Sequence, residues 1–572
     1  MRSVPDARAP RSGAHAPRGP GSDRSDWYPA TPTQQGIWIL DRIERLRPTY
    51  LLPSVLEFTG AVDCEVLTAA VARALARHPA LRSRFRLDAA ARRVDYRTDG
   101  SAPEVGFTDA VTDGWSSDEI ERLVEALCYT PFELADEAPA RAEVIRLGED
   151  RVLLVLTVHH IVFDGVSRQL LVDEIGTTYR ALVRGVEPEL PTPPHPAEVQ
   201  DRPEDGDGFA ERVAGVVERL RGAPTSVTLP YDGDPEDPEL SMVGATARTT
   251  VDADVTEAVL AVAAQEGCTA FMAGVALLAG TFARTTGQTD FLFAVVWPGR
   301  DDPAAADVIG MFMTTLVLRV RLDDGTTWRE LLRAARTGGM EAFIDSDVPL
   351  DAIAAALDAD RDMARPPLTP VLVNLAEDPA PLELSPGVVG HFQPLRPEYS
   401  KWDLALFVGL DRTTGRDRLE LSLNHPAALF TAATTAQLLA ELRSSAADLA
   451  RDPEDTVQNQ PSAEKIDLDD PAARLDLVRS IWREVLDTDQ VDDDVSFFDA
   501  GGDSLRLVIL VERLGQASGR ALRTVDLFRA GTVRGQADLL AAPADTAGAD
   551  RGSSRDRLLG AVRGRRTGDE RR

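Results

Sequence analysis

Lysine is almost absent from this chain. Of its 62 lysine and arginine residues only two are lysines, Lys401 and Lys465. In an alanine-rich chain this imbalance indicates codon bias from a GC-rich genome rather than selection on the surface. A single arginine is therefore no evidence of a phosphate ligand.

Cysteine and long hydrophobic runs are also scarce. The three cysteines, Cys64, Cys128 and Cys268, lie far apart without a CxxC pair, which excludes a disulfide framework and the usual zinc spacing. No apolar run approaches the roughly 20 residues that a membrane-spanning helix needs. The first 26 residues lack the apolar core of a secretory signal. Together these absences predict a cytoplasmic protein with reduced thiols.

Positive charge is in deficit. The chain carries 62 basic and 93 acidic residues, a formal charge of −31. Duplex nucleic acid and anionic membranes would both repel such a surface, so neither is expected as a partner. With 572 residues and 43% hydrophobic content, the chain has enough material for several buried cores. A monomer is expected.

Composition divides the chain into segments. A stretch rich in Pro, Asp and Glu lies at about 190–210, and a polar stretch bracketed by prolines begins near 451. The expected divisions are a disordered tail at 1–26, a first domain at 27–452 with halves of about 27–200 and 201–452, a linker at 453–465, a second domain at 466–542, and a disordered basic tail at 543–572.

Hydrophobic periodicity predicts an α/β protein. Residues 63–78 have helical spacing, with Asp63 as the N-cap, and 152–158 form a strand that is apolar on both faces. Residues 255–283 read as two helices separated at Gly267, and 475–487 as an amphipathic helix. Alternation of helices and buried strands favours the α/β class.

The segment His159–Gly165, HHIVFDG, follows the predicted buried strand directly. Histidine exchanges a proton near neutral pH, so it suits a nucleophile that must lose one during attack. Asp164 would need an arginine partner if buried, and Gly165 would allow a backbone angle or a close approach that other residues resist. Metal binding competes, although no further His, Cys or carboxylate group completes a ligand set. On these residues alone, the catalytic, metal and structural interpretations all remain open.

Further motifs extend the pattern well beyond that segment. From Trp27 to about Asp452 the sequence resembles a condensation domain of nonribosomal peptide synthetases. The motifs are the opening Tyr28–Trp38, RHxxLRxxF at Arg77–Phe85, HHxxxDG at His159–Gly165, IGxFVNT at Ile309–Leu316 and RDxSRxPL at Arg361–Leu368.

The resemblance implies two chloramphenicol-acetyltransferase-like α/β halves arranged in a V, with the active site in a tunnel between them. It implies that His160 is the catalytic histidine and contacts the acceptor. His159 and Gly165 belong to the motif, and Asp164 is implied to be structural, paired with Arg82.

The sequence also departs from the family pattern. Thr314 stands where the family has asparagine, Asp345–Asp351 replaces HQDxPFE, and the aromatic YxDFAxW segment is not recognisable near 190–200. These departures concern substrate type and tunnel shape, and leave His160 and Asp164 untouched.

A second motif lies in the C-terminal part, where Gly501–Leu505 reads GGDSL after FFDA and before an apolar helix. A serine there can be a plain helix N-cap. Over residues 466–542, however, the sequence resembles a four-helix peptidyl carrier domain. This implies that Ser504, flanked by Gly502, Asp503 and Leu505, carries a covalent 4'-phosphopantetheine. A helix start suits the phosphodiester, because it offers free N–H groups and the positive end of the dipole.

Together the resemblances imply an acyltransferase that works in natural-product biosynthesis. A donor thioester would arrive from an upstream carrier in trans, and the acceptor would be held on Ser504. The product would be an amide, or an ester from a hydroxyl acceptor. Neither an adenylation domain nor a GxxxxGK[ST] loop is found, so a stand-alone adenylation enzyme is expected to load Ser504. A phosphopantetheinyl transferase and a downstream module or releasing enzyme complete the expected partners.

Three alternatives remain open. The α/β part would be a non-catalytic docking platform if the degenerate later motifs outweighed His160. It would be an epimerisation domain, which shares HHxxxDG but usually follows its carrier. It would be an acyl-CoA acyltransferase if a carrier-free donor sufficed.

Overall fold

The structure is a computed structural model, and it divides the chain into two compact units at Gln458 and Asn459. This division falls inside the predicted linker. The residues described are 27–200, 208–224, 226–237, 239–357, 368–376, 379–395, 397–413, 415–457, 470–486, 488, 491–502, 506–507, 510–511, 513–514 and 524–540. The two predicted tails, at 1–26 and 543–572, lie outside them.

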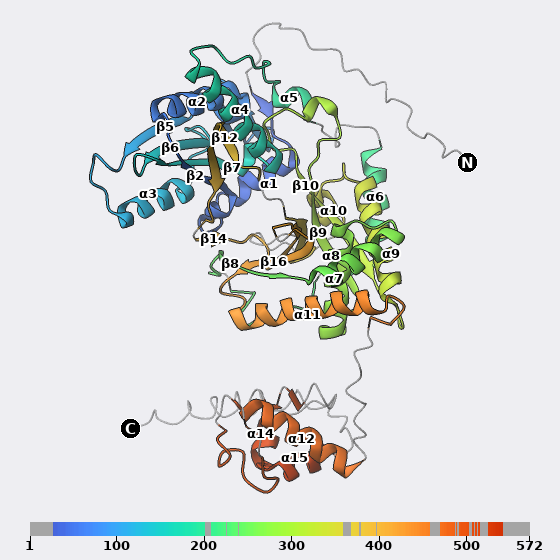
Figure 1. Cartoon of the computed structure of the whole chain (residues 1–572). Helices are drawn as coiled ribbons and strands as arrows, with labels where there is room; N and C mark the ends of the chain where they lie inside the picture. The colour runs from blue at the N-terminus through green and yellow to red at the C-terminus, as the bar shows by residue number, and fades with distance from the viewer. Residues whose placement is uncertain are drawn as a thin grey trace, which may run out of the picture. The chain divides into compact units, whose positions relative to one another are not determined.

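The first half of unit 1 is built on a six-stranded sheet with the order β12-β13-β2-β7-β6-β5, beside a three-stranded sheet, β1-β4-β3. Helices α2 and α4 pack together on one face of the larger sheet, and α3 packs on the other (Figure 1). The elements are β1 (Tyr28–Pro29), α1 (Pro32–Leu40), η1 (Glu44–Tyr50), β2 (Leu51–Thr59), α2 (Cys64–Arg77), η2 (Pro79–Arg82), β3 (Arg84–Asp88), β4 (Arg93–Arg97), β5 (Glu104–Asp109), α3 (Ser117–Tyr129), β6 (Ala140–Arg146), β7 (Arg151–His159), η3 (His160–Val162), α4 (Gly165–Val183) and α5 (Pro196–Val199).

The second half is built on a seven-stranded mixed sheet with the order β10-β9-β11-β15-β16-β8-β14. Its largest apolar core lies between this sheet and helices α7, α8, α9 and α11. The elements are α6 (Phe209–Leu220), β8 (Val243–Thr250), α7 (Ala253–Gln265), α8 (Ala270–Thr286), β9 (Asp290–Trp297), η5 (Pro303–Ala305), β10 (Thr314–Arg321), α9 (Trp328–Ile344), α10 (Leu350–Ala356), β11 (Val371–Leu375), β12 (Leu382–Ser385), β13 (Val388–Phe392), β14 (Glu398–Tyr399), β15 (Leu404–Asp411), β16 (Arg418–Pro426) and α11 (Ala432–Arg451).

The second half contributes a segment to the sheet of the first half. Strands β12 and β13 follow β11 of the second half in the chain, yet they join the first half's sheet through β13 and β2. In Figure 1 their yellow-orange colour stands beside the blue strands of the first half. Gly390 lies opposite Phe58, where a Cβ would come within 2.3 Å of the Phe58 ring. This pairing therefore depends on a close approach, and no pattern in the sequence predicted it.

The local predictions for unit 1 are confirmed. Helix α2 begins after Asp63, whose side chain accepts a hydrogen bond from the Val66 N–H at 3.0 Å. Strand β7 is buried along its whole length apart from its first residue. Helices α7 and α8 are separated at Gly267, which has a φ of +68°. The α/β prediction is thus correct for both halves.

The predicted linker begins too early. Residues 453–457 pack on the second half: the Pro453 carbonyl accepts from Arg329, and Val457 is 1% exposed. An isolated bridge joins Thr456 to Thr327. These residues belong to unit 1 because an apolar side chain and backbone hydrogen bonds hold them there. Residues 458–465 lie outside the described part.

Unit 2 is helical in its described part, with α12 (Pro471–Leu486), α14 (Thr524–Arg529) and α15 (Val533–Leu539). Helix α12 confirms the amphipathic helix predicted at 475–487. Its Trp482 is fully buried, packs edge-on against Phe497 at 5.0 Å, and donates from Nε1 to Gln536 at 2.8 Å. One aromatic side chain thus joins three segments of this unit.

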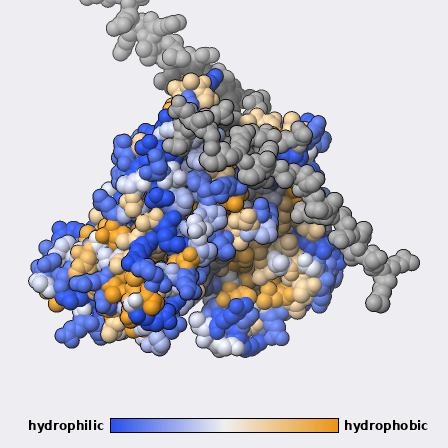
Figure 2. Space-filling model, turned by 90° about the horizontal axis from the view of Figure 1, so that it is seen from above, coloured by the Kyte–Doolittle hydropathy of each residue, from blue (hydrophilic) through white to orange (hydrophobic). Residues whose placement is uncertain are grey.

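The surface view shows mostly hydrophilic residues with apolar patches between them (Figure 2). Across the described residues, no single helix has both the length and the apolar character to cross a membrane. The bent pair of α7 and α8 meets those criteria jointly, by length and composition only, with 104° between its helices.

Candidate active site around the histidine pair

The histidine pair lies where the central strand of the first half ends. Strand β7 ends at His159, a short turn follows, and Asp164 caps helix α4 by accepting from the Ser167 N–H at 2.8 Å. Both histidines and Asp164 are buried, at 0%, 7% and 2% exposure. Strand, turn and capped helix together fix the backbone that carries these side chains.

His160 is held in one tautomer. Its Nδ1–H donates to the Phe163 carbonyl at 2.7 Å, which leaves Nε2 as an acceptor. Burial lowers the pKa of His160 well below its ordinary value, and the positive charge of Lys401 lowers it further. The ring is therefore neutral near pH 7, and its Nε2 can accept a proton.

His159 has a different environment. Its Nδ1 accepts from the Ile161 N–H at 3.1 Å, so its Nε2–H donates to Asp41 at 3.2 Å. Burial lowers the pKa of His159, while Asp41 opposes that shift. Arg47 lies 3.7 Å from the same Asp41 oxygen. With both ring nitrogens engaged, His159 supports the turn and does not present a free nitrogen.

The predicted pairing of Asp164 with Arg82 is wrong. Asp164 pairs with Arg300, whose Nη2 lies 2.9 and 3.0 Å from the two carboxylate oxygens. The side chains of this pair are 7% and 3% exposed. Arg82 is at the end of η2, and its Nε is buried without a hydrogen-bond partner among the described residues. Asp164 points toward the second half, which is why the partner comes from a loop 136 residues away.

Motifs distant in sequence meet at this turn. Gln34, from the opening motif, donates to the Ile161 carbonyl at 2.9 Å. Ser167 Oγ donates to the Gly310 carbonyl at 3.0 Å and accepts from the Gly310 N–H at 3.1 Å. The Phe312 N–H donates to Asp164 at 3.2 Å. The IGxFVNT segment of the second half is thus bonded directly to HHxxxDG.

Gly165 does not meet the expectation of a required backbone angle or close approach. Its φ is not positive, and a Cβ there would meet no atom within 4 Å. The space beside the first residue of α4 is open. Glycine at this position therefore keeps a gap near the histidine turn instead of relieving a clash.

Two of the side chains that would bind a metal ion in HHxxxD are already engaged by other protein groups. His159 bonds to Asp41, and Asp164 is paired with Arg300. Within the described ranges, no group of three or more His, Cys, Asp and Glu side chains is placed to hold a metal ion.

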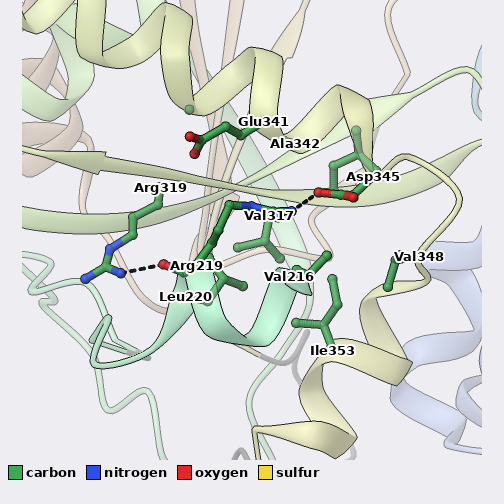
Figure 3. Close-up of a pocket in the computed structure, with 12 residues that line it drawn as sticks. Val216, Arg219, Leu220, Val317, Arg319, Glu341, Ala342, Asp345, Val348 and Ile353 are labelled. Atoms are coloured by element: carbon green, nitrogen blue, oxygen red, sulfur yellow. Dashed lines mark hydrogen bonds and ion pairs between the residues drawn. The ribbon is translucent and has the colours of Figure 1, made fainter. Parts of the chain in front are cut away.

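The atypical segment Asp345–Asp351 forms part of a separate pocket in the second half, between α6, β10, α9 and α10 (Figure 3). Asp345 forms an ion pair with Arg219, and Asp347 lies 3.1 Å from Arg212, both arginines being on α6. The departure from the family pattern thus supplies carboxylates that bind a neighbouring helix. The Arg361–Leu368 motif lies outside the described residues except for Leu368.

In unit 2 the loop before the GGDSL serine is tightly built. Gly501 has a φ of +98°, which favours glycine. A Cβ on Gly502 would lie 2.4 Å from the buried Phe497 ring, and the Gly502 N–H donates to the Phe497 carbonyl at 2.8 Å. Asp503, Ser504 and Leu505 lie outside the described residues.

Comparison with known protein families identifies two domains in the chain. The family described as Condensation domain matches residues 24–468, and Phosphopantetheine attachment site matches residues 476–540. The chain belongs to the condensation-domain family. Its condensation domain is followed by a carrier domain of the nonribosomal peptide synthetase type. A domain of this kind carries 4'-phosphopantetheine on a serine. In the loop before the GGDSL serine, an added Cβ on Gly501 would meet no atom within 4 Å, so open space lies on that side of the loop.

The condensation domain resembles both synthetases and solved structures. It is 30% identical over 382 residues to the probable non-canonical nonribosomal peptide synthetase CymA of Salinispora arenicola, covering 64% of this chain and 5% of that protein. It is 29% identical over 454 residues to the phosphinothricin tripeptide synthetase PhsC of Streptomyces viridochromogenes, covering 78% of this chain and 41% of that protein. The chain thus spans less than half of either relative.

Two solved structures show the same fold. The X-domain from teicoplanin biosynthesis superposes with a TM-score of 0.67 at 23% identity, covering 77% of this chain and 98% of that one. The first condensation domain of the calcium-dependent antibiotic synthetase gives 0.61 at 22% identity, covering 76% and 98%.

Proposed function

We propose that the chain is a condensation–carrier didomain that joins a donor acyl or peptidyl thioester to an acceptor held on its own carrier. The observation that carries this proposal is His160, a buried and neutral imidazole whose Nδ1–H is fixed on Phe163 while Nε2 stays free to accept a proton. The ion pair between Asp164 and Arg300 supports the turn from the other half.

The acceptor amine would attack the carbonyl carbon of the donor thioester. A C–N bond forms and the C–S bond breaks, and the donor carrier leaves as a thiol. His160 Nε2 would accept the proton that the amine loses, and that proton passes to the departing sulfur. An acceptor hydroxyl would give an ester by the same steps.

Ser504 is proposed as the attachment residue, because GGDSL holds the serine of the pattern within the matched carrier range. A phosphopantetheinyl transferase would install the arm, and a separate adenylation enzyme would load the acceptor. The donor would come from an upstream carrier, and a downstream module or releasing enzyme would take the product. Purified protein given ATP and amino acids is therefore expected to remain unacylated.

The test is made in the producing organism. Wild-type protein and His160→Ala are isolated and the mass attached to Ser504 is determined by intact and fragment mass spectrometry. Wild type should carry an extended chain, and His160→Ala only the single acceptor unit. The matched control is His391→Ala, an exposed histidine on β13, which should carry the extended chain. Equal loads on wild type and His160→Ala would contradict condensation at His160.

A docking platform is the second candidate function. A teicoplanin X-domain, solved in complex with OxyB, matches this chain with a TM-score of 0.69, above the 0.61 of the condensation domain cited. A platform would recruit a partner enzyme to the carrier-bound intermediate and would tolerate His160→Ala. Epimerisation would instead invert the Ser504-bound unit without any donor, and an acyl-CoA acyltransferase would work with a carrier-free donor.

A further inference from the structure

Helix α1 reaches the histidine turn with two buried polar side chains. Gln34 is 2% exposed, its Nε2 donates to the Ile161 carbonyl at 2.9 Å, and its Oε1 accepts from the Thr31 N–H. Asp41, the C-cap of the helix, is 5% exposed, and its Oδ1 lies 3.2 Å from His159 Nε2. The two side chains are seven residues apart, about two helical turns, so they lie on the same face of the helix. One face of α1 therefore supports the turn from within the first half.

The hydrogen bonds of His159 select one tautomer of its ring. The Ile161 N–H is a donor, so His159 Nδ1 at 3.1 Å must be the acceptor. The proton of the neutral ring is then on Nε2, and the Asp41 carboxylate, which only accepts, is its partner. In the other tautomer, Nδ1–H would face the Ile161 N–H, and Nε2 would face the carboxylate without a proton. Asp41 thus favours the one tautomer in which His159 caps the turn.

The Asp41 carboxylate is itself held in place. Arg47 Nε lies 3.7 Å from Asp41 Oδ1, the same oxygen that accepts from His159. The Arg47 Nη2 donates to the Phe132 carbonyl at 2.7 Å and to Glu133 at 2.9 Å, which fixes the guanidinium at its other end. A buried carboxylate needs a nearby cation to offset its loss of hydration. One oxygen atom of Asp41 therefore joins the arginine to the histidine.

The capped turn carries His160. It consists of η3, His160–Val162, with His159 as its N-cap and Phe163 as its C-cap. The Phe163 carbonyl accepts from His160 Nδ1–H at 2.7 Å, so the same short turn holds both the backbone and the ring of His160. Because the cap is the Nδ1 atom of His159, a change in the His159 ring would move the backbone of the turn and redirect His160 Nε2.

We propose that Asp41 is a positioning residue of the condensation reaction, which fixes the tautomer of His159 and thereby the direction of His160 Nε2. This inference rests on the proposed function. Asp41 must supply an acceptor oxygen at the Oδ1 position, because that atom makes both contacts. An asparagine can place its carbonyl oxygen there, whereas a leucine of similar size cannot accept a hydrogen bond.

The first experiment needs no substrate. The full chain is labelled with 15N at its seven histidines, and His159→Gln and His160→Gln assign the ring signals of the pair. In wild type and Asp41→Asn, His159 should be protonated at Nε2 and His160 at Nδ1. Asp41→Leu should populate the second tautomer of His159 and shift the His160 signals, while His391 and His425 keep their signals and report an intact fold.

Two results of this experiment would overturn the proposal, whether or not the protein condenses anything. One is a wild-type His159 that is protonated at Nδ1, which needs no variant to observe. The other is that both histidines in Asp41→Leu give the signals of the wild type.

The second experiment measures condensation kinetics with the native donor and acceptor carriers, identified as above. Asp41→Leu should lower kcat about a hundredfold, since a misplacement of about 1 Å costs about that much, and should leave KM within about threefold. Asp41→Asn should keep kcat within about threefold of wild type. The matched control is Glu44→Leu, which removes an exposed carboxylate 3.9 Å from Arg47 and should leave kcat unchanged.

The kinetics separate the positioning role from the proposed function. Equal losses of kcat for Asp41→Asn and Asp41→Leu would show that the acceptor oxygen is not what matters. A loss expressed in KM would show an effect on substrate binding, and both results would contradict the positioning role. Absence of His160-dependent condensation in wild type would instead defeat the proposed function, and the histidine signals would still test the tautomer of His159.

Discussion

In each half of the condensation domain, a buried histidine lies near the end of one strand or directly after it. Strands β7 and β16 both have nine residues, both lie between antiparallel neighbours, and helices of 19 and 20 residues follow them, α4 and α11. His160 follows β7 directly, and His425 lies near the end of β16, 3% exposed.

The two histidines differ in what surrounds them. The His425 Nδ1–H donates to the Pro426 carbonyl at 3.1 Å, and its ring packs edge-on against Phe430 at 5.6 Å. These partners follow it within five residues. In the turn after His160, by contrast, Asp164 pairs with Arg300 from the opposite half. A buried histidine thus lies near a strand end in both halves, and the turn that follows His160 is bonded to the opposite half through Asp164.

The largest effect is expected from removing the support that crosses between the halves. Arg300→Leu leaves the buried Asp164 carboxylate unpaired and should lower the free energy of unfolding by about 3 to 5 kcal/mol. Calorimetry of the full chain measures this. The matched control is Arg321→Leu, whose side chain is 64% exposed and lies 3.9 Å from Asp290, with an expected change below about 1 kcal/mol. Equal effects would show that the buried pair is dispensable.

A smaller effect is expected from the second histidine. His425→Ala removes a packed ring and should cost about 1 to 3 kcal/mol of unfolding free energy while the condensation rate of the folded protein is unchanged. Calorimetry and the carrier-loading assay check the two quantities separately. If His425→Ala lost as much condensation activity as His160→Ala, the proposed difference in role between the two histidines would be wrong.

The smallest effect concerns Gly165. Because a Cβ there meets no atom and φ is not positive, Gly165→Ala should raise the free energy of unfolding by about 0.4 to 1 kcal/mol. Gly502→Ala is the contrasting control, since its Cβ would overlap the Phe497 ring and should destabilise unit 2. Urea titration of the full chain measures both. Destabilisation by Gly165→Ala would show that the space beside Gly165 does not accommodate a methyl group.

Much of the local structure could be predicted because it depends on neighbouring residues. The N-cap at Asp63, the break at Gly267 and the buried strand before His159 all follow from short patterns. The motifs also identified the condensation and carrier families, which the comparisons confirmed.

The partners of the active-site turn could not be predicted in the same way. Arg300 and Arg82 are both arginines in a chain rich in them, and only the meeting of the two halves selects Arg300 for Asp164. The sequence of strands β12 and β13 contains no pattern that indicates which of the two sheets they join. The assignments of His160 as catalytic and Ser504 as the attachment residue stay predictions.

The position of β12 and β13 in the first half's sheet affects where condensation domains can be cut and joined to make hybrid synthetases. A cut at the predicted boundary near residue 200 would separate β2 from β13 and leave the β2 edge of a hydrophobic sheet unpaired. Open edges invite pairing with other chains. A hybrid synthetase made by joining half-domains would carry that exposed edge, whereas a transplant of the whole segment from 27 to 457 keeps every strand with its neighbour.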